Sequence, residues 1–207
     1  MSVNEKKQGL LVVVSGPAGS GKGTVIGELM RDESSCFSVS ATTRAPRPGE
    51  INGVNYHFLT REEFVSRIAA GDLLEYTEYC GNYYGTLKKQ TEEVLASGKN
   101  LFLEIEVEGA ANVKAQYPDA VAIMLRPPSF EIQEARLRGR GTETEESITA
   151  RLARARKEVK QIANYDYVVF NYDGKASEAV EDIRAILRAE RATIRRNNDV
   201  PTRYFEH

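Results

Sequence analysis

The chain has 207 residues, of which 41% are hydrophobic and 28% are charged, a length and balance typical of one globular domain with or without a small appendage. These values exclude two large domains, wholesale disorder and a fibrous protein. The 28 Lys and Arg nearly cancel the 30 Asp and Glu, and the formal net charge of -2 argues against nucleic acid as a partner.

Membrane insertion, secretion and metal or thiol chemistry leave few signals in the sequence. The longest apolar runs, at residues 10–14 and 121–125, are far shorter than the ~18–20 residues that span a membrane, and no secretory-type apolar stretch precedes them. We therefore expect a cytoplasmic protein without a membrane partner. Two cysteines and two histidines are too few for a disulfide framework, a Cys/His zinc site or a histidine-activated nucleophile.

The first predicted element is a strand over residues 10–15, an uninterrupted aliphatic run of the kind that is buried on both faces. It leads directly into a loop of glycine and small residues. A helix is predicted over residues 24–31, where apolar side chains recur at helical spacing. The order is strand, glycine loop, helix.

Residues 38–92 carry shorter segments of alternating polarity. Strands are expected over 38–43, 55–59 and 74–79, around one helix over 61–70. Half of the ten tyrosines of the chain lie in this stretch. Such a pattern favours an inserted, partly antiparallel subdomain.

The rest of the chain alternates buried strands and amphipathic helices. Strands are predicted over residues 100–105, 120–125 and 167–171, and helices over residues 108–116, 129–137, 145–162 and 177–195. This alternation predicts right-handed crossovers and an α/β fold with a doubly wound parallel sheet. The charged, glycine-punctuated residues 138–146 interrupt two helices and favour a small lid.

The glycine loop has the spacing of a P-loop, Gly16-x-x-x-x-Gly21-Lys22, between a strand and a helix. Its backbone N–H groups and the helix N-terminus would surround a phosphate, and Lys22 would reach the β and γ phosphates of a nucleoside triphosphate. The predicted cofactor-binding residues are Gly16, Pro17, Ala18, Gly19, Ser20, Gly21, Lys22, Gly23 and Thr24.

One position departs from the general P-loop pattern. Gly23 follows the lysine where Ser or Thr usually ligates Mg²⁺, and the hydroxyl is displaced to Thr24. We expect phosphate oxygens and water to hold most of the metal shell, since Mg²⁺ keeps much of its hydration. Glu106, directly after the second buried strand, has two interpretations: a carboxylate that meets Mg²⁺ through water, or a cap of the following helix.

Arg44 and Arg47 stand three residues apart, with prolines that stiffen the chain between and after them. This arrangement favours a fork for a phosphate dianion, although a solvated basic turn is the alternative. Tyr56 and Tyr84 lie downstream and could donate hydroxyls to the same phosphate or belong to a subdomain core. GTPase and protein-kinase motifs, Asn-Lys-x-Asp and His-Arg-Asp, do not occur.

In residues 16–24, 38–56, 81–86, 103–109 and 138–151, and at Asn171, the chain resembles the guanylate kinases of the nucleoside monophosphate kinase group. The order and spacing of these stretches are far more specific than a P-loop alone. The resemblance implies transfer of the γ-phosphoryl group of ATP, with Mg²⁺, to GMP and also to dGMP. The products are ADP and GDP in purine nucleotide metabolism.

The resemblance also implies roles for individual residues. It places the GMP phosphate on Arg44, Arg47, Tyr56 and Tyr84, and guanine on Ser40, Glu75 and Thr86. Glu106 is a further expected substrate-binding residue. A carboxylate such as Glu75 accepts from the ring N–H and exocyclic amine of guanine, whereas adenine presents no such donor pair. Without the family, Glu75 would be read as a surface residue.

On the ATP side the resemblance assigns Arg140 and Arg151 to the triphosphate and Asn171 to the neighbourhood of adenine. Arg136 is a further candidate for binding the triphosphate. An arginine on the exposed face of a helix explains its presence equally well. Glu104 and Glu106 stand where the family often has aspartate, so the geometry around Mg²⁺ stays open. The acceptor phosphate is already an anion, so no general base is needed and the implied catalytic residues are cations: Lys22, Arg44, Arg140 and Arg151.

The resemblance implies one domain over residues 1–207, and a monomer and a homo-oligomer both stay open. Its parts would be a core of 1–37, 93–137 and 160–207, a GMP-binding subdomain of 38–92 and a lid of 138–159. Two alternatives share features with this interpretation. They are a kinase for another monophosphate and an inactive module of the same fold that binds phosphorylated peptides, although such a module would not need Lys22.

Overall fold

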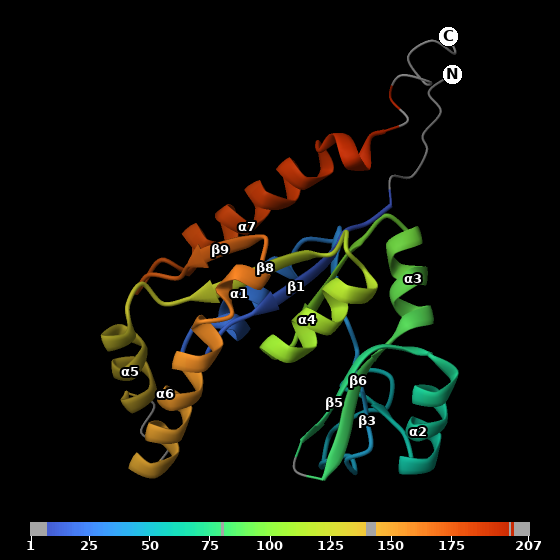
Figure 1. Cartoon of the computed structure of the whole chain (residues 1–207), viewed down its shortest axis with the longest axis horizontal. Coiled ribbons are helices and arrows are strands. Elements are labelled where there is room, and N and C mark those ends of the chain that lie inside the picture. The colour runs from blue at the N-terminus through green and yellow to red at the C-terminus, as the bar shows by residue number, and fades with distance from the viewer. Residues whose placement is uncertain (1–7, 80, 140–143, 199, 201–207) are drawn as a thin grey trace.

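The computed structural model describes residues 8–79, 81–139, 144–198 and 200. It contains a five-stranded sheet in the order β2-β7-β1-β8-β9 and a four-stranded sheet in the order β4-β3-β6-β5. Figure 1 shows the two sheets as separate bodies, joined through the region of α3 and α4. The prediction of an α/β fold with an inserted subdomain is confirmed.

All strands of the five-stranded sheet, hereafter the parallel sheet, run in the same direction. They are β1 (Leu11–Ser15), β2 (Ser35–Phe37), β7 (Asn100–Glu104), β8 (Val121–Arg126) and β9 (Tyr167–Phe170). From β1 the chain goes to the edge strand β2 and returns to β7 on one side, and then continues to β8 and β9 on the other. This is a doubly wound order, as predicted from the sequence. In such sheets ligands bind beyond the carboxyl ends of the strands, where the two directions diverge.

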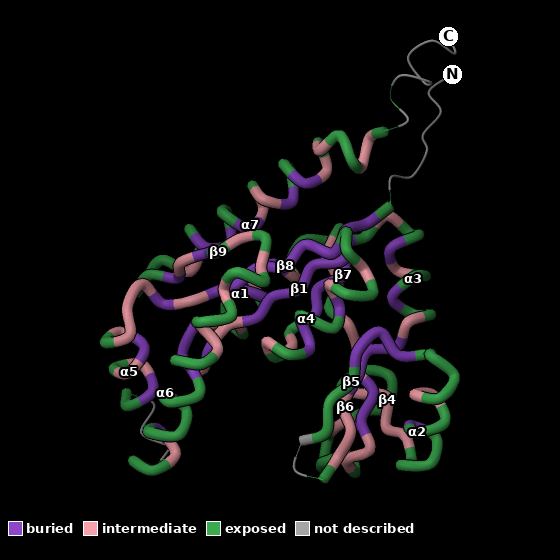
Figure 2. The backbone as a smooth tube through the Cα atoms, in the orientation of Figure 1, coloured by how far each residue is buried: buried purple, intermediate pink, exposed green. Residues whose placement is uncertain are grey.

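Helices cover both faces of the parallel sheet. Their bounds are α1 (Lys22–Leu29), α3 (Lys88–Ala96), α4 (Val107–Gln116) and α7 (Ala176–Arg191). Successive side chains of a strand point to opposite faces, so Val12 and Val14 pack with α1 and α7, whereas Leu11 and Val13 pack with α3 and α4. Figure 2 shows the buried strands between these helices.

The four-stranded sheet and α2 form the mixed-sheet subdomain, residues 41–87. Its elements are β3 (Ala41–Thr42), β4 (His57–Phe58), α2 (Arg61–Ala70), β5 (Leu73–Tyr79) and β6 (Asn82–Leu87). β3 pairs with β4 in parallel, and the other two pairs are antiparallel. Phe64 of α2 is fully buried on the sheet and stacks on Tyr83 at 5.3 Å between ring centroids. Leu74 of β5 packs instead into the α4 side of the parallel sheet and links the two bodies.

α5 (Phe130–Arg138) and α6 (Glu145–Val159) form a helical arm beyond the carboxyl end of β8. Leu137 of α5 packs with Ile148 and Leu152 of α6, and Ala18 of the glycine loop contacts this cluster. The arm is therefore seated on the P-loop itself. The four residues between Gly139 and Thr144 lie outside the described residues.

Several predicted elements are wrong in detail. Of the expected strand over 38–43, only Ala41–Thr42 is a strand, which belongs to the mixed sheet. Residues 35–37 form an unpredicted strand, β2, which pairs with β7 at the edge of the parallel sheet. β6 and α3 were not predicted as a strand and a helix. α3 crosses the expected subdomain boundary between residues 92 and 93.

Helix ends also differ from the predicted ones. α1 begins at Lys22, where the loop closes, rather than at residue 24, and α6 ends at Val159, followed by a 3-10 turn at Ile162–Asn164. α7 ends at Arg191, before a second 3-10 turn at Ile194–Arg196.

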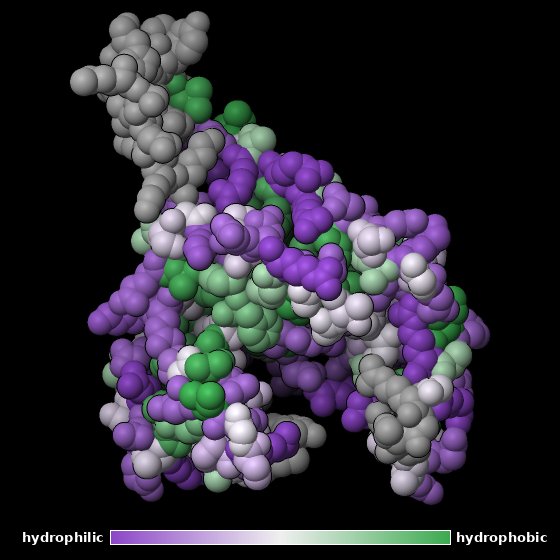
Figure 3. All heavy atoms as spheres, turned by 180° about the vertical axis from the view of Figure 1, so that it is seen from behind, coloured by the Kyte–Doolittle hydropathy of each residue, from purple (hydrophilic) through white to green (hydrophobic). Residues whose placement is uncertain are grey.

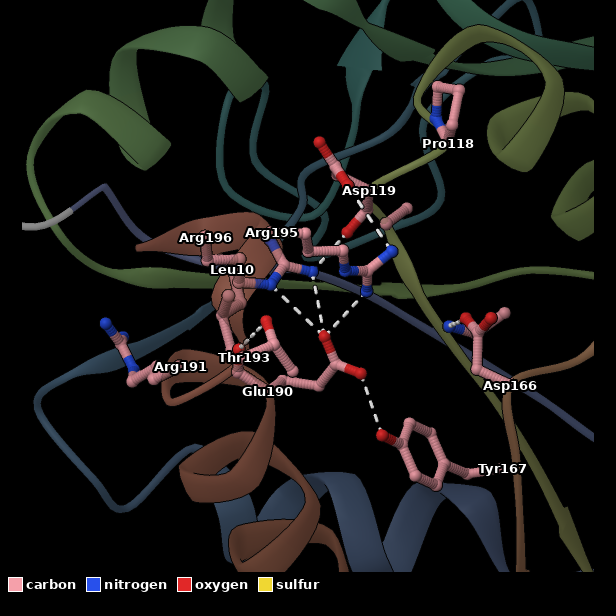
Figure 4. Close-up of polar contacts among 12 residues, drawn as sticks. Leu10, Pro118, Asp119, Asp166, Tyr167, Glu190, Arg191, Thr193, Arg195 and Arg196 are labelled. Carbon is pink, nitrogen blue, oxygen red and sulfur yellow. Dashed lines mark hydrogen bonds and ion pairs between the residues drawn. The ribbon is translucent and has the colours of Figure 1, made fainter. Parts of the chain in front are cut away.

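A buried carboxylate joins this second turn to the amino end of the parallel sheet (Figure 4). Glu190 accepts hydrogen bonds from Tyr167 Oη at 2.7 Å, Arg195 at 2.8 Å and Arg196 at 3.1 Å. Burial alone would raise the pKa of Glu190, but the bonds from Arg195, Tyr167 and Arg196 outweigh burial and lower it. Arg195 also pairs with Asp119 before β8. The network therefore fixes the end of α7 at the amino ends of the strands, whereas the P-loop lies at the carboxyl end of β1.

In the described part of the chain, none of the helices is both long and apolar enough to cross a lipid bilayer.

Candidate active site

The P-loop connects the carboxyl end of β1 to the first turn of α1. A Cβ on Gly16 would lie 1.9 Å from the carbonyl oxygen of Leu125, and a Cβ on Gly21, where φ is +85°, would lie 2.3 Å from the side-chain amide of Asn171. Both positions therefore require glycine. Lys22 Nζ donates to the carbonyl oxygen of Gly16 at 2.5 Å, which folds the lysine over the loop that it follows.

Asn171 and Arg136 hold the outer side of the loop. Asn171 directly follows β9, is buried, and donates from Nδ2 to the carbonyl oxygen of Ser20 at 2.9 Å. Arg136 donates to the carbonyl oxygens of Gly19 at 3.2 Å and Asn171 at 2.7 Å, and to Asp173 at 2.9 Å. It is half-buried, so the interpretation of Arg136 as an exposed helix residue is wrong.

A hollow of about 570 Å³ opens beside these residues. Gly19, Gly21, Thr24, Arg136 and Asn171 line it, together with residues at the start of α7. Its volume lies within the ~300–1,000 Å³ that small-molecule sites usually have. Ser20 Oγ is buried here without a hydrogen-bond partner among the described residues, so the loop holds an unsatisfied polar atom next to its amides.

Glu106 begins α4, but its side chain makes no cap hydrogen bond. The capping interpretation is therefore wrong. The Glu106 carboxylate instead forms an ion pair with Arg154 of α6, and Arg154 also binds Glu158 at 2.8 Å. Glu104 is exposed at the end of β7. Among the described residues no group of three or more His, Cys, Asp or Glu could hold a metal ion. Thr24 lines the hollow with its hydroxyl next to the P-loop.

Arg44 in the mixed-sheet subdomain is held from several sides. Its guanidinium pairs with Glu50 at 2.9 Å, donates to the carbonyl oxygen of Ala45 at 2.7 Å and lies 5.4 Å from the ring centroid of Tyr56. The rings of Tyr56 and Tyr84 meet edge to face, with their centroids 6.2 Å apart. The structure thus brings Arg44, Tyr56 and Tyr84 together, as expected for a phosphate site.

Glu50 was not predicted as a site residue. One of its oxygens pairs with Arg44 and the other accepts from the backbone N–H of Arg47 at 2.7 Å. The hydrogen bond from Arg44, with that from the Arg47 amide, lowers the pKa of Glu50. The side chain of Arg47 is exposed. Glu50 therefore fixes the turn that carries both arginines.

Glu75 and Thr86 face each other on β5 and β6. Thr86 Oγ1 donates to Glu75 Oε1 at 2.7 Å, and both residues are buried. Burial raises the pKa of Glu75, and the two hydrogen bonds from Thr86 oppose this rise only in part. Reading Glu75 as a surface residue is wrong. Ser40, half-buried, precedes β3 in the same subdomain.

Helix α4 contacts β5 and approaches Glu75 from the side of the parallel sheet. A Cβ on Gly109 would lie 3.4 Å from Glu75 Oε2, so the glycine lets the helix approach the carboxylate closely. The space-filling view shows an open cleft between the mixed-sheet subdomain and the helical arm, with hydrophilic residues at its back (Figure 3). The P-loop and Glu75 belong to the two bodies that border this cleft.

Comparison with known proteins gives a match to the guanylate kinase family model over residues 8–190. The chain belongs to the guanylate kinase family. It is 47% identical over 193 residues to a guanylate kinase of Clostridium tetani, covering 93% of this chain and 92% of that protein. A guanylate kinase of Halalkalibacterium halodurans is 50% identical over 187 residues, 90% of this chain and 91% of that protein.

A crystal structure of guanylate kinase from Anaplasma phagocytophilum has a TM-score of 0.69 and 34% sequence identity to this chain. The alignment covers 90% of this chain and 88% of that one. This member of the guanylate kinase family thus has the fold of its relatives over most of its length.

Two of the arginines expected on the ATP side stay predictions. Arg151 is exposed on α6, and Arg140 lies outside the described residues. No role in the site was predicted from the sequence for Arg154, Glu50 or Glu158. The spacing of Arg154 and Glu158 by four residues on a helix was the one available signal for that pair.

Proposed function

We infer that this guanylate kinase family member transfers the γ-phosphoryl group of ATP to GMP, and also to dGMP, and releases ADP and GDP. The observation that carries this inference is a P-loop with Lys22 on one side of the cleft and the buried pair of Glu75 and Thr86 on the other. One site suits a triphosphate and the other suits a base with two adjacent donors.

On the ATP side, the loop amides from Gly16 to Thr24 surround the phosphates and Lys22 exchanges its bond to Gly16 for phosphate oxygens. Arg136 and Asn171 border the hollow that receives the adenosine. Nucleotide kinases of this family generally use Mg-ATP, and Mg²⁺ supplies charge neutralisation on the phosphates. Thr24 is suited to hold it directly and Glu106 through water.

On the GMP side, Arg44, Arg47, Tyr56 and Tyr84 bind the acceptor phosphate. Glu50 orients Arg44 before GMP arrives, so less conformational entropy is lost on binding. The dianion then competes with Glu50 for the guanidinium. This exchange keeps a desolvated arginine paired in both states.

Guanine recognition falls to Glu75, Thr86 and Ser40. Thr86 occupies one oxygen of Glu75, while Oε2 faces α4 near Gly109. An ionised Glu75 accepts from the guanine ring N–H and exocyclic amine, whereas adenine would leave the buried carboxylate without donors. This difference selects GMP over AMP.

The reaction itself depends on position and charge. The acceptor phosphate is already an anion, so Lys22, Arg44, Arg140 and Arg151 act by aligning the substrates and stabilising the charge on the transferred group. Residues 38–92 and 138–159 are the parts proposed to close over the substrates, which keeps water from the γ-phosphoryl group. The cytoplasmic location and the lack of nucleic-acid or membrane partners stay predictions from the sequence, and the oligomeric state stays open.

The decisive experiment measures ADP release with ATP and Mg²⁺ against GMP, dGMP, AMP, CMP and UMP in turn. Turnover with GMP and dGMP, and little with the others, is the expected result. Equal turnover with AMP would contradict the roles of Glu75 and Thr86. Absence of turnover with every acceptor, combined with binding of a phosphorylated peptide, would favour the inactive module.

A further inference from the structure

A second cavity, separate from the hollow at Asn171, lies between α5 and α6 at the carboxyl end of β8. Its volume is about 280 Å³, and it shares no lining residue with the first hollow. The roles proposed above for ATP and GMP involve none of its side chains. Two lining residues connect it to the P-loop: Pro17 at the start of the loop, and Gln133, whose side-chain amide donates to the carbonyl oxygen of Ala18 at 2.8 Å.

The walls of this cavity are mostly apolar. They are formed by Pro17, Pro127, Phe130, Ala155 and Val159. Ser129 and Gln133 also line the cavity, but Ser129 Oγ accepts from the backbone N–H of Ile132 and Gln133 Nε2 donates to the carbonyl oxygen of Ala18. The hydroxyls of a sugar would therefore lie mostly against apolar surface, which leaves polar groups unpaired. A flat apolar group would bury its surface here without that cost.

The lining also includes three cations, Arg126, Arg156 and Lys160, and no acidic residue. Arg156 lies over the ring of Phe130 at 4.5 Å, and Arg126 lies over the ring of Phe170 at 5.3 Å. Within the described ranges none of the three cations forms an ion pair with a carboxylate. The cavity therefore has an uncompensated positive charge beside apolar walls.

The spacing of residues along α6 explains how this helix reaches both Glu106 and the second cavity. Arg154 and Glu158, four residues apart, lie on the side that reaches Glu106. Ala155 and Val159, and likewise Arg156 and Lys160, are also four residues apart and line the second cavity. One helix thus presents one face to the nucleotide cleft and another to this cavity.

From this lining we propose that the second cavity binds a small organic anion with a flat apolar body, of the aromatic carboxylate class. The ring lies against Phe130 and Val159, and the carboxylate pairs with Arg156 and Lys160. Inorganic phosphate would leave the apolar walls unfilled, and a nucleotide would place its sugar against them. The proposal does not depend on the function proposed for the nucleotide cleft.

The test uses 2-naphthoate as the probe and titration calorimetry as the readout. The chain is first saturated with ADP and GMP, which occupies both nucleotide sites. We expect binding with a dissociation constant of about 1 mM or lower, in line with the affinity that a ligand of this size can reach. The uncharged analogue 2-naphthamide should bind at least about tenfold more weakly, since it cannot form the charged hydrogen bonds.

Variants locate the site. Arg156→Gln and Lys160→Gln should each weaken 2-naphthoate binding severalfold, because both side chains line the cavity. Lys157→Gln is the matched control, since Lys157 is exposed on the same helix and outside the lining. Circular dichroism verifies that all three variants fold.

Four results would overturn the proposal. They are loss of binding when ADP and GMP are present, equal binding of the amide, equal effects of Lys157→Gln and the two lining variants, and displacement of 2-naphthoate by an equal concentration of inorganic phosphate. The last result would reduce the cavity to a general anion site.

Discussion

The hydroxyl of Thr86 donates a 2.7 Å hydrogen bond to the carboxylate of Glu75, and the pair is buried where β5 and β6 meet α4. A buried carboxylate is costly unless its lone pairs are satisfied. Thr86 satisfies one oxygen of Glu75 in advance, and the guanine donors would satisfy the rest. The cost of keeping this carboxylate desolvated is therefore recovered when the right base binds.

Glu75→Gln should lower kcat/KM for GMP by roughly 1–3 kcal/mol, about tenfold to a hundredfold, because a charged acceptor is lost. KM for ATP should stay unchanged. Steady-state kinetics measure both, and Glu78→Gln on the exposed part of the same strand is the control. An equal loss in the two variants would remove Glu75 from the guanine site.

Thr86→Val should shift the pH dependence of GMP use. Burial already raises the pKa of Glu75, and the hydrogen bonds from Thr86 oppose that rise. Valine keeps the backbone bond but loses the one from Oγ1, which raises the pKa further. Because GMP binding needs the ionised carboxylate, the acid limb of kcat/KM for GMP should move to higher pH. A pH profile in which the acid limb does not move would show that Glu75 does not control it.

Glu50→Ala should raise KM for GMP about two- to tenfold, the loss expected when one side chain is no longer held before binding. Arg44 and the Arg47 turn lose their shared partner, while the chemical step keeps its cations. kcat should therefore change less than KM. Glu62→Ala, an exposed carboxylate of α2, serves as the comparison. A lower KM for GMP would mean that Glu50 acts mainly as a competitor of the phosphate.

Glu190→Gln should lower the free energy of unfolding by about 1–3 kcal/mol at pH 7, since bonds from a tyrosine and two arginines to a buried charge are weakened. Urea titrations measure this loss. The kinetic constants should stay the same, because the network lies at the amino ends of β8 and β9, whereas the P-loop follows the carboxyl end of β1.

The pH dependence of this stability follows from the lowered pKa of Glu190. A carboxylate with a lowered folded pKa stabilises the protein above its unfolded pKa, and this contribution disappears as pH falls through the folded pKa. The difference in stability between the unchanged chain and Glu190→Gln should therefore shrink on acidification below about pH 4.5. A constant difference across that range would exclude the ionised pair as its source.

The sequence predicted the parts of the fold that carry strong local patterns. β1, β7 and β8 are mostly aliphatic runs. The spacing of Gly16, Gly21 and Lys22 between a strand and a helix rarely occurs by chance. The family resemblance added the grouping of Arg44, Tyr56 and Tyr84, which the structure brings together. The roles of these residues in binding stay predictions.

The missed parts lack such patterns. β2 is a three-residue edge strand, partly exposed, and needs no aliphatic run. α3 begins after Leu87 without a side-chain cap and buries only Thr91 and Leu95. The two sequence signals of a helix, a capping residue at its start and a regularly repeated apolar face, are therefore both missing. The pairing of Glu106 with Arg154 joins residues far apart in the chain, and spacing cannot reveal it.

The ion pair between Glu106 and Arg154 has one further consequence for solution conditions. Both side chains are more than half exposed, 63% and 55%, and exposed pairs of this kind contribute only about 0–1 kcal/mol. Screening by salt weakens them further, since the Debye length at physiological ionic strength is about 8 Å. The distance between α6 and the start of α4 in the ligand-free protein should therefore depend on ionic strength. Rates measured in dilute and in concentrated buffer would start from ensembles that differ in how widely the cleft is open.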